Sequence, residues 1–195
     1  CFDVGRQLQR AATIAVRYSA VRRQSEIQPG NGEVQILDYQ TQQHSLIPQL
    51  ATVFAVMFSA RRLWDDYNSV THDISDSGDL SMLPELHALS CGLKAASSSE
   101  CSAGVEVCRL SCGGHGYLAS SNLPRILTNT LATQTYEGEN TVMWLQVARY
   151  LQKCHRDCKD GLPVPPSVSF LGAPPRRDAQ HLSNDGLVSG WQSGT

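Results

Sequence analysis

The feature that most constrains this fold is a series of apolar residues spaced three and four positions apart in the first half of the chain. Such spacing aligns side chains on one face of an α-helix, whereas a half-buried strand alternates at every second position. The series predicts a helix over about residues 38–70, whose apolar face consists of Leu46, Leu50, Val53, Met57, Ala60 and Trp64. Asp38 is placed to cap this helix, and Pro48 must either kink it or mark a boundary near its start.

Three other stretches carry helical spacing. They predict helices over residues 2–24, 84–112 and 141–153, and Asn140 or Thr141 is placed to cap the last of them. No segment shows a convincing strand period. The predicted fold class is therefore all-α, an antiparallel four-helix bundle.

The segments between these helices have loop composition. Residues 25–34 contain Pro29-Gly30-Asn31-Gly32, residues 71–81 are polar, and a short apolar piece covers residues 123–131. Small residues at 95–99 would allow a neighbouring helix to approach closely.

The chain changes character after Lys153. Prolines, glycines and serines dominate, and no apolar period survives. We therefore expect a bundle domain over residues 1–153 and an extended linker or tail over 154–195, for which disorder is one interpretation. The chain starts with Cys1 rather than Met and carries no leader pattern, so we expect a fragment.

Composition excludes several functional classes. The net charge is −2, from 16 basic and 18 acidic residues, and no basic block gives an electrostatic case for nucleic acid. The longest apolar run, residues 51–58, is too short for a membrane span. The seven cysteines are odd in number and fit no secreted disulfide framework, which favours a reducing compartment.

Two cysteine clusters could in principle bind zinc, and the first is Cys108, Cys112 and His115. The second comprises Cys154, His155 and Cys158. Neither has the usual Cys-x2-Cys spacing, and buried free cysteine is a common small apolar residue. We expect no metal and keep a zinc-stabilised module as the weakest alternative.

The stretch TYEGENT, residues 135–141, is the candidate catalytic segment. Glu137 and Glu139 flank Gly138 where a loop leads into a helix. A glycine there lets the backbone turn tightly and a ligand approach closely, which suits a catalytic base. The alternative is that two acids merely complement the dipole at a helix N-terminus.

The order of several motifs resembles a known family. Arg22-Arg23 at a helix end, a Gln-rich helix start, CGGHGY and TYEGENTVMWLQVARYLQK together resemble the C-terminal helical domain of the acyl-CoA dehydrogenase and oxidase superfamily. VRYSAVRRQ, ILDYQTQQHSLIP and YEGENTV are most similar to peroxisomal acyl-CoA oxidases. Dehydrogenases usually carry Thr or Ser at the position of Glu139. The resemblance covers roughly residues 2–172.

The resemblance implies an FAD-dependent enzyme that oxidises fatty acyl-CoA to trans-2-enoyl-CoA in the peroxisome. A base removes the α proton, the β hydrogen leaves as hydride to the flavin, and molecular oxygen then takes the electrons to give H2O2. The motif match places the base on Glu137, with Gly138 beside the substrate and Glu139 as second choice. A carboxylate is a weak base for removing an α C–H proton. Hydrogen bonds that stabilise the developing enolate oxygen would supply much of the missing driving force.

The same matching implies the cofactor contacts. Arg22 corresponds to the arginine on the FAD pyrophosphate, Gln40 to the glutamine near the adenine end, and Gly113, Gly114 and Gly116 to a loop along the dinucleotide of a neighbouring subunit. This implies a homodimer with a shared cofactor site. The alternatives are that the glycines cap a helix and that Arg22-Arg23 compensates its dipole. His115 is expected to be structural.

Two other functions remain open beside the oxidase: a dehydrogenase that passes electrons to a protein, and a non-catalytic helical interaction module. The family also needs an N-terminal helical domain and a β-domain, which this sequence does not contain. We therefore expect the isolated chain to be inactive.

Overall fold

The computed structural model of the protein describes residues 1–173. Its α-helices are α1 (Phe2–Val21), α2 (Gln40–Ser77), α3 (Leu83–Leu110), α4 (Leu123–Ala132) and α5 (Asn140–Lys159). Short 3-10 helices cover Ile36–Asp38, Gly113–Tyr117, Ala119–Ser121 and Pro166–Gly172. Over residues 1–173 the only β pairing is one isolated bridge, Arg23 with Gln35. The predicted all-α class is confirmed.

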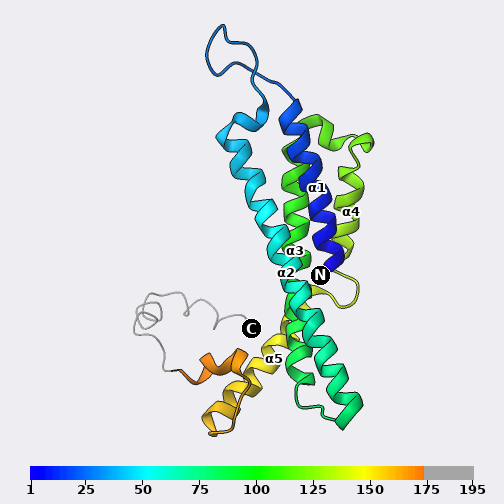
Figure 1. Ribbon diagram of the computed structural model, residues 1–195, viewed down its shortest axis with the longest axis vertical. Helices are drawn as coiled ribbons and strands as arrows, with labels where there is room; N and C mark the ends of the chain where they lie inside the picture. Colours follow the sequence, from blue (N-terminus) through cyan, green and yellow to red (C-terminus); the bar gives the residue numbers. More distant parts are fainter. Residues whose placement is uncertain (174–195) are drawn as a thin grey trace, which may run out of the picture. The chain divides into compact units, whose positions relative to one another are not determined.

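The bundle consists of α1, α2, α3 and α4. α3 packs against all three others, and α1 also packs against α2 and α4. Figure 1 shows α1 and α3 running in one direction and α2 and α4 in the other, so successive helices are antiparallel. The fourth bundle helix is α4, whereas the sequence predicted the segment 141–153 as the fourth helix. Residues 123–131 were read only as a short apolar piece, because so short a helix offers few repeats of the apolar period.

The core lies where α1, α2 and α3 meet, with the start of α4. Leu8, Leu46, Val105 and Leu123 are almost completely buried there. Each such side chain stabilises the fold by about 1.5–3 kcal/mol relative to exposure. Gly104 on α3 lets the other helices come close, because a side-chain carbon there would stand 2.8 Å from Leu8 Cδ1.

α2 differs from its predicted bounds. It begins at Gln40 after the N-cap Tyr39 and ends at Ser77, so Asp38 lies in the preceding 3-10 turn and does not cap it. Pro48 lies inside the helix. Within residues 1–173, α2 alone is long and apolar enough to cross a membrane. A core helix of a soluble protein passes the same test, so the expected absence of a membrane span stays a prediction.

Internal contacts divide the chain into Cys1–Ala148 and a second unit that begins at Arg149. In the second unit, α5 continues to Lys159, and the chain turns at Gly161, with φ of +72°, toward the 3-10 helix that buries Val168. The predicted domain boundary after residue 153 stays a prediction. Residues 174–195 of the expected tail lie outside the described residues.

Candidate functional site

The candidate base lies in the turn that joins α4 to α5. Both Glu137 and Gly138 have left-handed backbone conformations, with φ of +56° and +102°. Glu137 is exposed and lines a cavity of about 70 Å³ together with Asp3, Lys94 and Tyr136. The turn therefore presents a carboxylate at the mouth of a small hollow.

Gly138 is required by its backbone conformation, and its surroundings add a contact with a flexible side chain. Its φ disfavours any residue with a side chain. A side-chain carbon there would also collide with the end of the Met143 side chain. The sequence predicted a tight turn at this glycine, and the positive φ confirms it; its role beside a substrate stays a prediction.

Glu139 is the cap of α5. Its carboxylate accepts the Thr141 amide at 2.8 Å and the Thr141 hydroxyl at 3.2 Å. A carboxylate at a helix N-terminus satisfies a free amide and complements the helix dipole. The predicted cap, Asn140 or Thr141, is thus wrong. Glu139 is held in this role, which makes it the poorer of the two candidate bases.

Asn140 is a buried anchor that sequence analysis missed. Its Nδ2 donates to the hydroxyls of Ser98 and Ser99 at 2.9 and 3.0 Å, and its Oδ1 accepts from Lys94 Nζ at 2.9 Å. Lys94 Nζ also donates to the Gly138 carbonyl at 2.5 Å. The partners are more than forty positions apart along the chain, so no local pattern could pair them.

Tyr136 lies next to the base in sequence. Partial burial raises the pKa of its phenol, and the carboxylates of Asp3 and Glu137 raise this pKa further. The phenol therefore keeps its proton to higher pH than usual. It remains a hydrogen-bond donor at this site.

A second hollow lies at the other end of the bundle. A cavity of about 700 Å³ is bounded by the end of α1, the start of α2 and the 3-10 turn after α3. Of the predicted cofactor residues, Arg22, Gly113 and Gly114 line it, and Gln40 and Gly116 do not. The structure thus brings three predicted residues together from segments that are far apart in sequence.

The two arginines that end α1 differ in their contacts. Arg23 Nη1 donates to the Glu33 carbonyl at 3.0 Å and so holds the loop of residues 25–34. Within residues 1–173, the Arg22 guanidinium has no hydrogen bond or ion pair, although it lines the cavity. A guanidinium fork matches phosphate oxygens, so Arg22 is the one fitted to bind an anion.

The three glycines also differ. Gly113 has φ of +57°, and nothing lies within 4 Å of where a side-chain carbon would stand at Gly113 or Gly114. Gly116 is buried, and a side chain there would collide with the Arg109 carbonyl of α3. Packing therefore explains Gly116, while the other two leave backbone open to the cavity.

The glutamines at the start of α2 are mostly structural. Gln42 Nε2 donates at 2.8 Å to both the Ser19 hydroxyl and the Ser111 carbonyl, which joins α1, α2 and the end of α3. Gln43 donates to the Leu37 carbonyl. Gln40 is exposed at the first position of α2. His115 Nδ1 forms a hydrogen bond of 2.9 Å with the Tyr18 hydroxyl.

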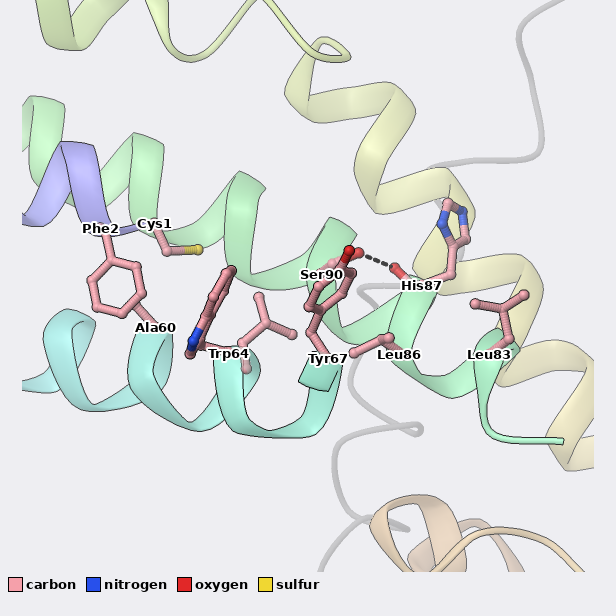
Figure 2. Close-up of a pocket in the computed structure, with 10 residues that line it drawn as sticks. Cys1, Phe2, Ala60, Trp64, Tyr67, Leu83, Leu86, His87 and Ser90 are labelled. Atoms are coloured by element: carbon pink, nitrogen blue, oxygen red, sulfur yellow. Dashed lines mark hydrogen bonds between the residues drawn. The ribbon is translucent and has the colours of Figure 1, made fainter. Parts of the chain in front are cut away.

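An apolar cavity of about 400 Å³ lies between α2 and α3. Figure 2 shows Trp64 and Tyr67 of α2 along it, Leu83 and Leu86 of α3 beside them, and Phe2 at one end. Trp64 and Tyr67 stack with ring centroids 5.7 Å apart. This lining offers hydrocarbon and aromatic surface, and it contains none of the predicted site residues.

The described part of the chain contains no group of three His, Cys, Asp or Glu side chains that could hold a metal ion. Burial raises the pKa of the Cys108 thiol to about 12 and also raises that of Cys112. These thiols are therefore protonated in the absence of a metal, and the expected absence of zinc stays a prediction.

Comparison with known proteins identifies the family of this chain. A family model of the acyl-CoA oxidase C-alpha1 domain matches residues 1–152. The chain belongs to the acyl-CoA oxidase family. The resemblance inferred from the sequence motifs is thereby confirmed.

Individual acyl-CoA oxidases agree with this assignment. Acyl-coenzyme A oxidase 1 of Drosophila melanogaster is 51% identical over 169 residues, which are 87% of this chain and 25% of that protein. Human peroxisomal acyl-coenzyme A oxidase 1 is 49% identical over 178 residues, 91% of this chain and 27% of that protein. The chain thus spans about a quarter of the length of these oxidases.

Solved structures of acyl-CoA oxidases share the fold. The Caenorhabditis elegans acyl-CoA oxidase-1 complexed with FAD and ATP aligns with a TM-score of 0.84 and 41% identity, covering 88% of this chain and 27% of that one. The tomato enzyme aligns with a TM-score of 0.82 and 44% identity, covering 87% and 26%.

Proposed function

We propose that this chain is the base-bearing part of an FAD-dependent acyl-CoA oxidase that converts fatty acyl-CoA to trans-2-enoyl-CoA and reduces O2 to H2O2. Its placement in the peroxisome is part of the proposal. Support comes from relatives of about 50% identity that are named peroxisomal acyl-coenzyme A oxidases. This chain spans about a quarter of the length of these relatives, so the activity belongs to a longer enzyme that contains it.

The observation that carries the proposal is the conformation of the Glu137 turn. A non-glycine residue with φ of +56° followed by a glycine at +102° is uncommon, and such conformations cluster at functional sites. Here the turn carries an exposed glutamate that lines a small hollow. A helix start that only needed a dipole partner has one in Glu139, so it has no need of this conformation at Glu137.

In the proposed reaction, Glu137 accepts the α proton of the thioester. Gly138 gives the turn beside the substrate its positive φ, and Glu139 keeps the N-terminus of α5 fixed. The substrate would exclude water from Glu137, which is exposed in the described residues. Exclusion of water strengthens the electrostatic interactions within such a site.

The second cavity fits part of a flavin dinucleotide. Arg22 would hold the pyrophosphate, because its guanidinium is free of other partners in residues 1–173, and the amides of Gly113 and Gly114 are open to a ligand. Gln40 is exposed between Tyr39 and Thr41, which line the cavity, and it would contact the adenine end of FAD. When bound, FAD accepts the β hydride and passes two electrons to O2. Gly116 acts through packing of the same turn.

A cofactor shared between subunits is also part of the proposal, and it implies a homodimer. The runner-up is an acyl-CoA dehydrogenase, which would reduce a protein acceptor instead of oxygen. Oxygen consumption with H2O2 formation supports the oxidase, whereas reduction of a dye or flavoprotein without oxygen uptake supports the dehydrogenase. A holoenzyme that binds no flavin would leave the non-catalytic helical module.

The decisive experiment replaces Glu137 by Gln in a holoenzyme of the length of its relatives. Fatty acyl-CoA is mixed anaerobically, and bleaching of the flavin is followed. Because a positioned base contributes about 10²–10⁴-fold, we expect bleaching to slow by at least a hundredfold while the thioester still binds. Bleaching at the wild-type rate would refute Glu137 as the base.

Glu139→Gln is the matched control, since it removes a carboxylate two positions away. We expect it to lower stability by only about 0.3–1 kcal/mol through the lost charge at the helix N-terminus, because the Gln amide oxygen can still accept from Thr141, with bleaching changed less than tenfold. A larger loss in Glu139→Gln than in Glu137→Gln would exchange their roles. The 195-residue chain alone is expected to give no H2O2 with added flavin, because it lacks most walls of the site.

A further inference from the structure

Lys94 of α3 reaches the segment that follows the candidate base. Its Nζ donates to the Gly138 carbonyl at 2.5 Å and to Asn140 Oδ1 at 2.9 Å. One ammonium group thus contacts residues on both sides of Glu139. An ammonium carries three donors on one atom, which suits two acceptors that converge on a point.

The second acceptor is itself fixed. Asn140 is 8% exposed, and its Nδ2 donates to Ser98 Oγ, Ser99 Oγ and the Ala95 carbonyl. All these partners lie on α3 shortly after Lys94, between Ala95 and Ser99. The two sides of the contact are therefore a regular helix and the start of α5, and the turn with Glu137 is held between them.

The turn needs such support. Left-handed conformations of residues with side chains persist where the surroundings over-determine them. Gly138 is adjacent to Glu137, and a bond to its carbonyl fixes the orientation of the peptide that follows the turn. Lys94 and Glu137 also line the same small cavity, with Asp3 and Tyr136. Loss of the ammonium would free the peptide next to the base.

We infer that Lys94 is a positioning residue for Glu137: the ammonium holds the base turn so that the carboxylate keeps its direction. This inference rests on the proposed function, in which Glu137 removes the α proton. The competing explanation is that Lys94 only stabilises the packing of α3 against the start of α5. The two explanations predict different rates of flavin reduction in enzyme that is folded and loaded with flavin.

The test compares Lys94→Met with wild type in the holoenzyme. Methionine has a similar length and no donor. A misplacement of about 1 Å costs roughly 100-fold, so we expect anaerobic flavin reduction per bound flavin to slow about 10- to 100-fold. Acyl-CoA affinity should change less than threefold, and the α-deuterium isotope effect should rise. Lys94→Arg, which keeps a cation with donors, should recover most of the rate.

A purely structural role gives another pattern. Flavin-loaded Lys94→Met would then melt earlier but reduce its flavin at the wild-type rate, and this result would overturn the inference. If Lys94→Met yields no folded holoenzyme, Lys94→Gln decides, because its side chain is shorter and uncharged and cannot replace the ammonium. A wild-type rate in Lys94→Gln would equally overturn it, and a tenfold loss would support it.

Two controls separate this inference from the proposed function. Lys153→Met removes an exposed lysine elsewhere and should change no rate. Glu137→Gln runs in parallel. If it reduces flavin normally, the proposed function fails and the inference with it; if it is inactive while Lys94→Met is normal, only the inference fails.

Discussion

The two candidate sites of this chain are built in opposite ways. At the base turn, the backbone is held by a buried asparagine and a lysine, and the hollow beside Glu137 is only about 70 Å³. At the far end of the bundle, the cavity is about 700 Å³ and Arg22 has no partner within residues 1–173. The backbone of the first site is held by contacts within the chain, whereas the second site presents an arginine that makes none within the described residues.

The difference indicates what each site contributes. A catalytic group must keep its direction, and a well-connected turn provides that before any ligand arrives. A cofactor site supplies contacts that are satisfied only when the ligand is bound. Under the proposed function, one short domain would fix the base with its own residues and leave its cofactor contacts to be completed by FAD.

The contrast between a fixed base turn and an open cofactor site would fail if Gly138 tolerated a side chain. Gly138→Ala puts a methyl group at φ of +102° and against Met143. We expect about 100-fold slower flavin reduction, because the turn must shift, and a loss of stability of roughly 1–3 kcal/mol. Stopped-flow reduction and thermal unfolding measure both. Gly172→Ala, with only ordinary contact to Cys158, is the control, and equal behaviour of the two variants would contradict the account.

A smaller effect sharpens the contrast between neighbouring arginines. Arg22→Met should weaken FAD binding about 10- to 100-fold, since hydrogen bonds to charged groups contribute about 1.5–3 kcal/mol. Arg23→Met removes only a bond to the Glu33 carbonyl and should weaken it less than threefold. Titration of apoenzyme with FAD at two salt concentrations checks this. Equal losses would show that general charge at the end of α1 is responsible.

The smallest expected effect concerns the glycine turn. Gly116→Ala crowds the Arg109 carbonyl and should lower stability by roughly 1–3 kcal/mol. Its effect on FAD affinity should be smaller than that of Arg22→Met, because Gly116 does not line the cavity. Denaturant unfolding and FAD titration separate the two. A large affinity loss with unchanged stability would return Gly116 to direct cofactor contact.

Helical periodicity was enough to predict most of the fold. The long apolar face of α2 followed from spacing, and the start of α3 near Pro84 followed from the preference of proline for the first turn of a helix. α4 was not recognised as a helix, because ten residues between turn signals carry little periodicity. The end of α2 at Ser77 was also missed. Its last turns are polar, so they carry no apolar spacing that would have extended the predicted helix.

The site was predictable only where motifs are local. TYEGENT placed Glu137 and Gly138 in one turn, and the structure agrees. Lys94, Ser98 and Ser99 were not recognised as its support, because their contacts with Asn140 depend on how α3 packs. The resemblance assigned Arg22 and not Arg23 to the cofactor, and this role stays a prediction. The contact of Arg23 with the Glu33 carbonyl could not be read from the sequence, because it depends on the path of the loop.

The most direct test of the central claim is hydrogen exchange at the substrate α carbon. An acyl-CoA analogue with no β hydrogen is incubated with the holoenzyme in D2O, and deuterium at the α position is measured by mass spectrometry. We expect wild type to exchange this hydrogen and Glu137→Gln to do so about 10²–10⁴-fold more slowly, since only proton removal is observed. Exchange by Glu137→Gln at the wild-type rate would show that another group is the base.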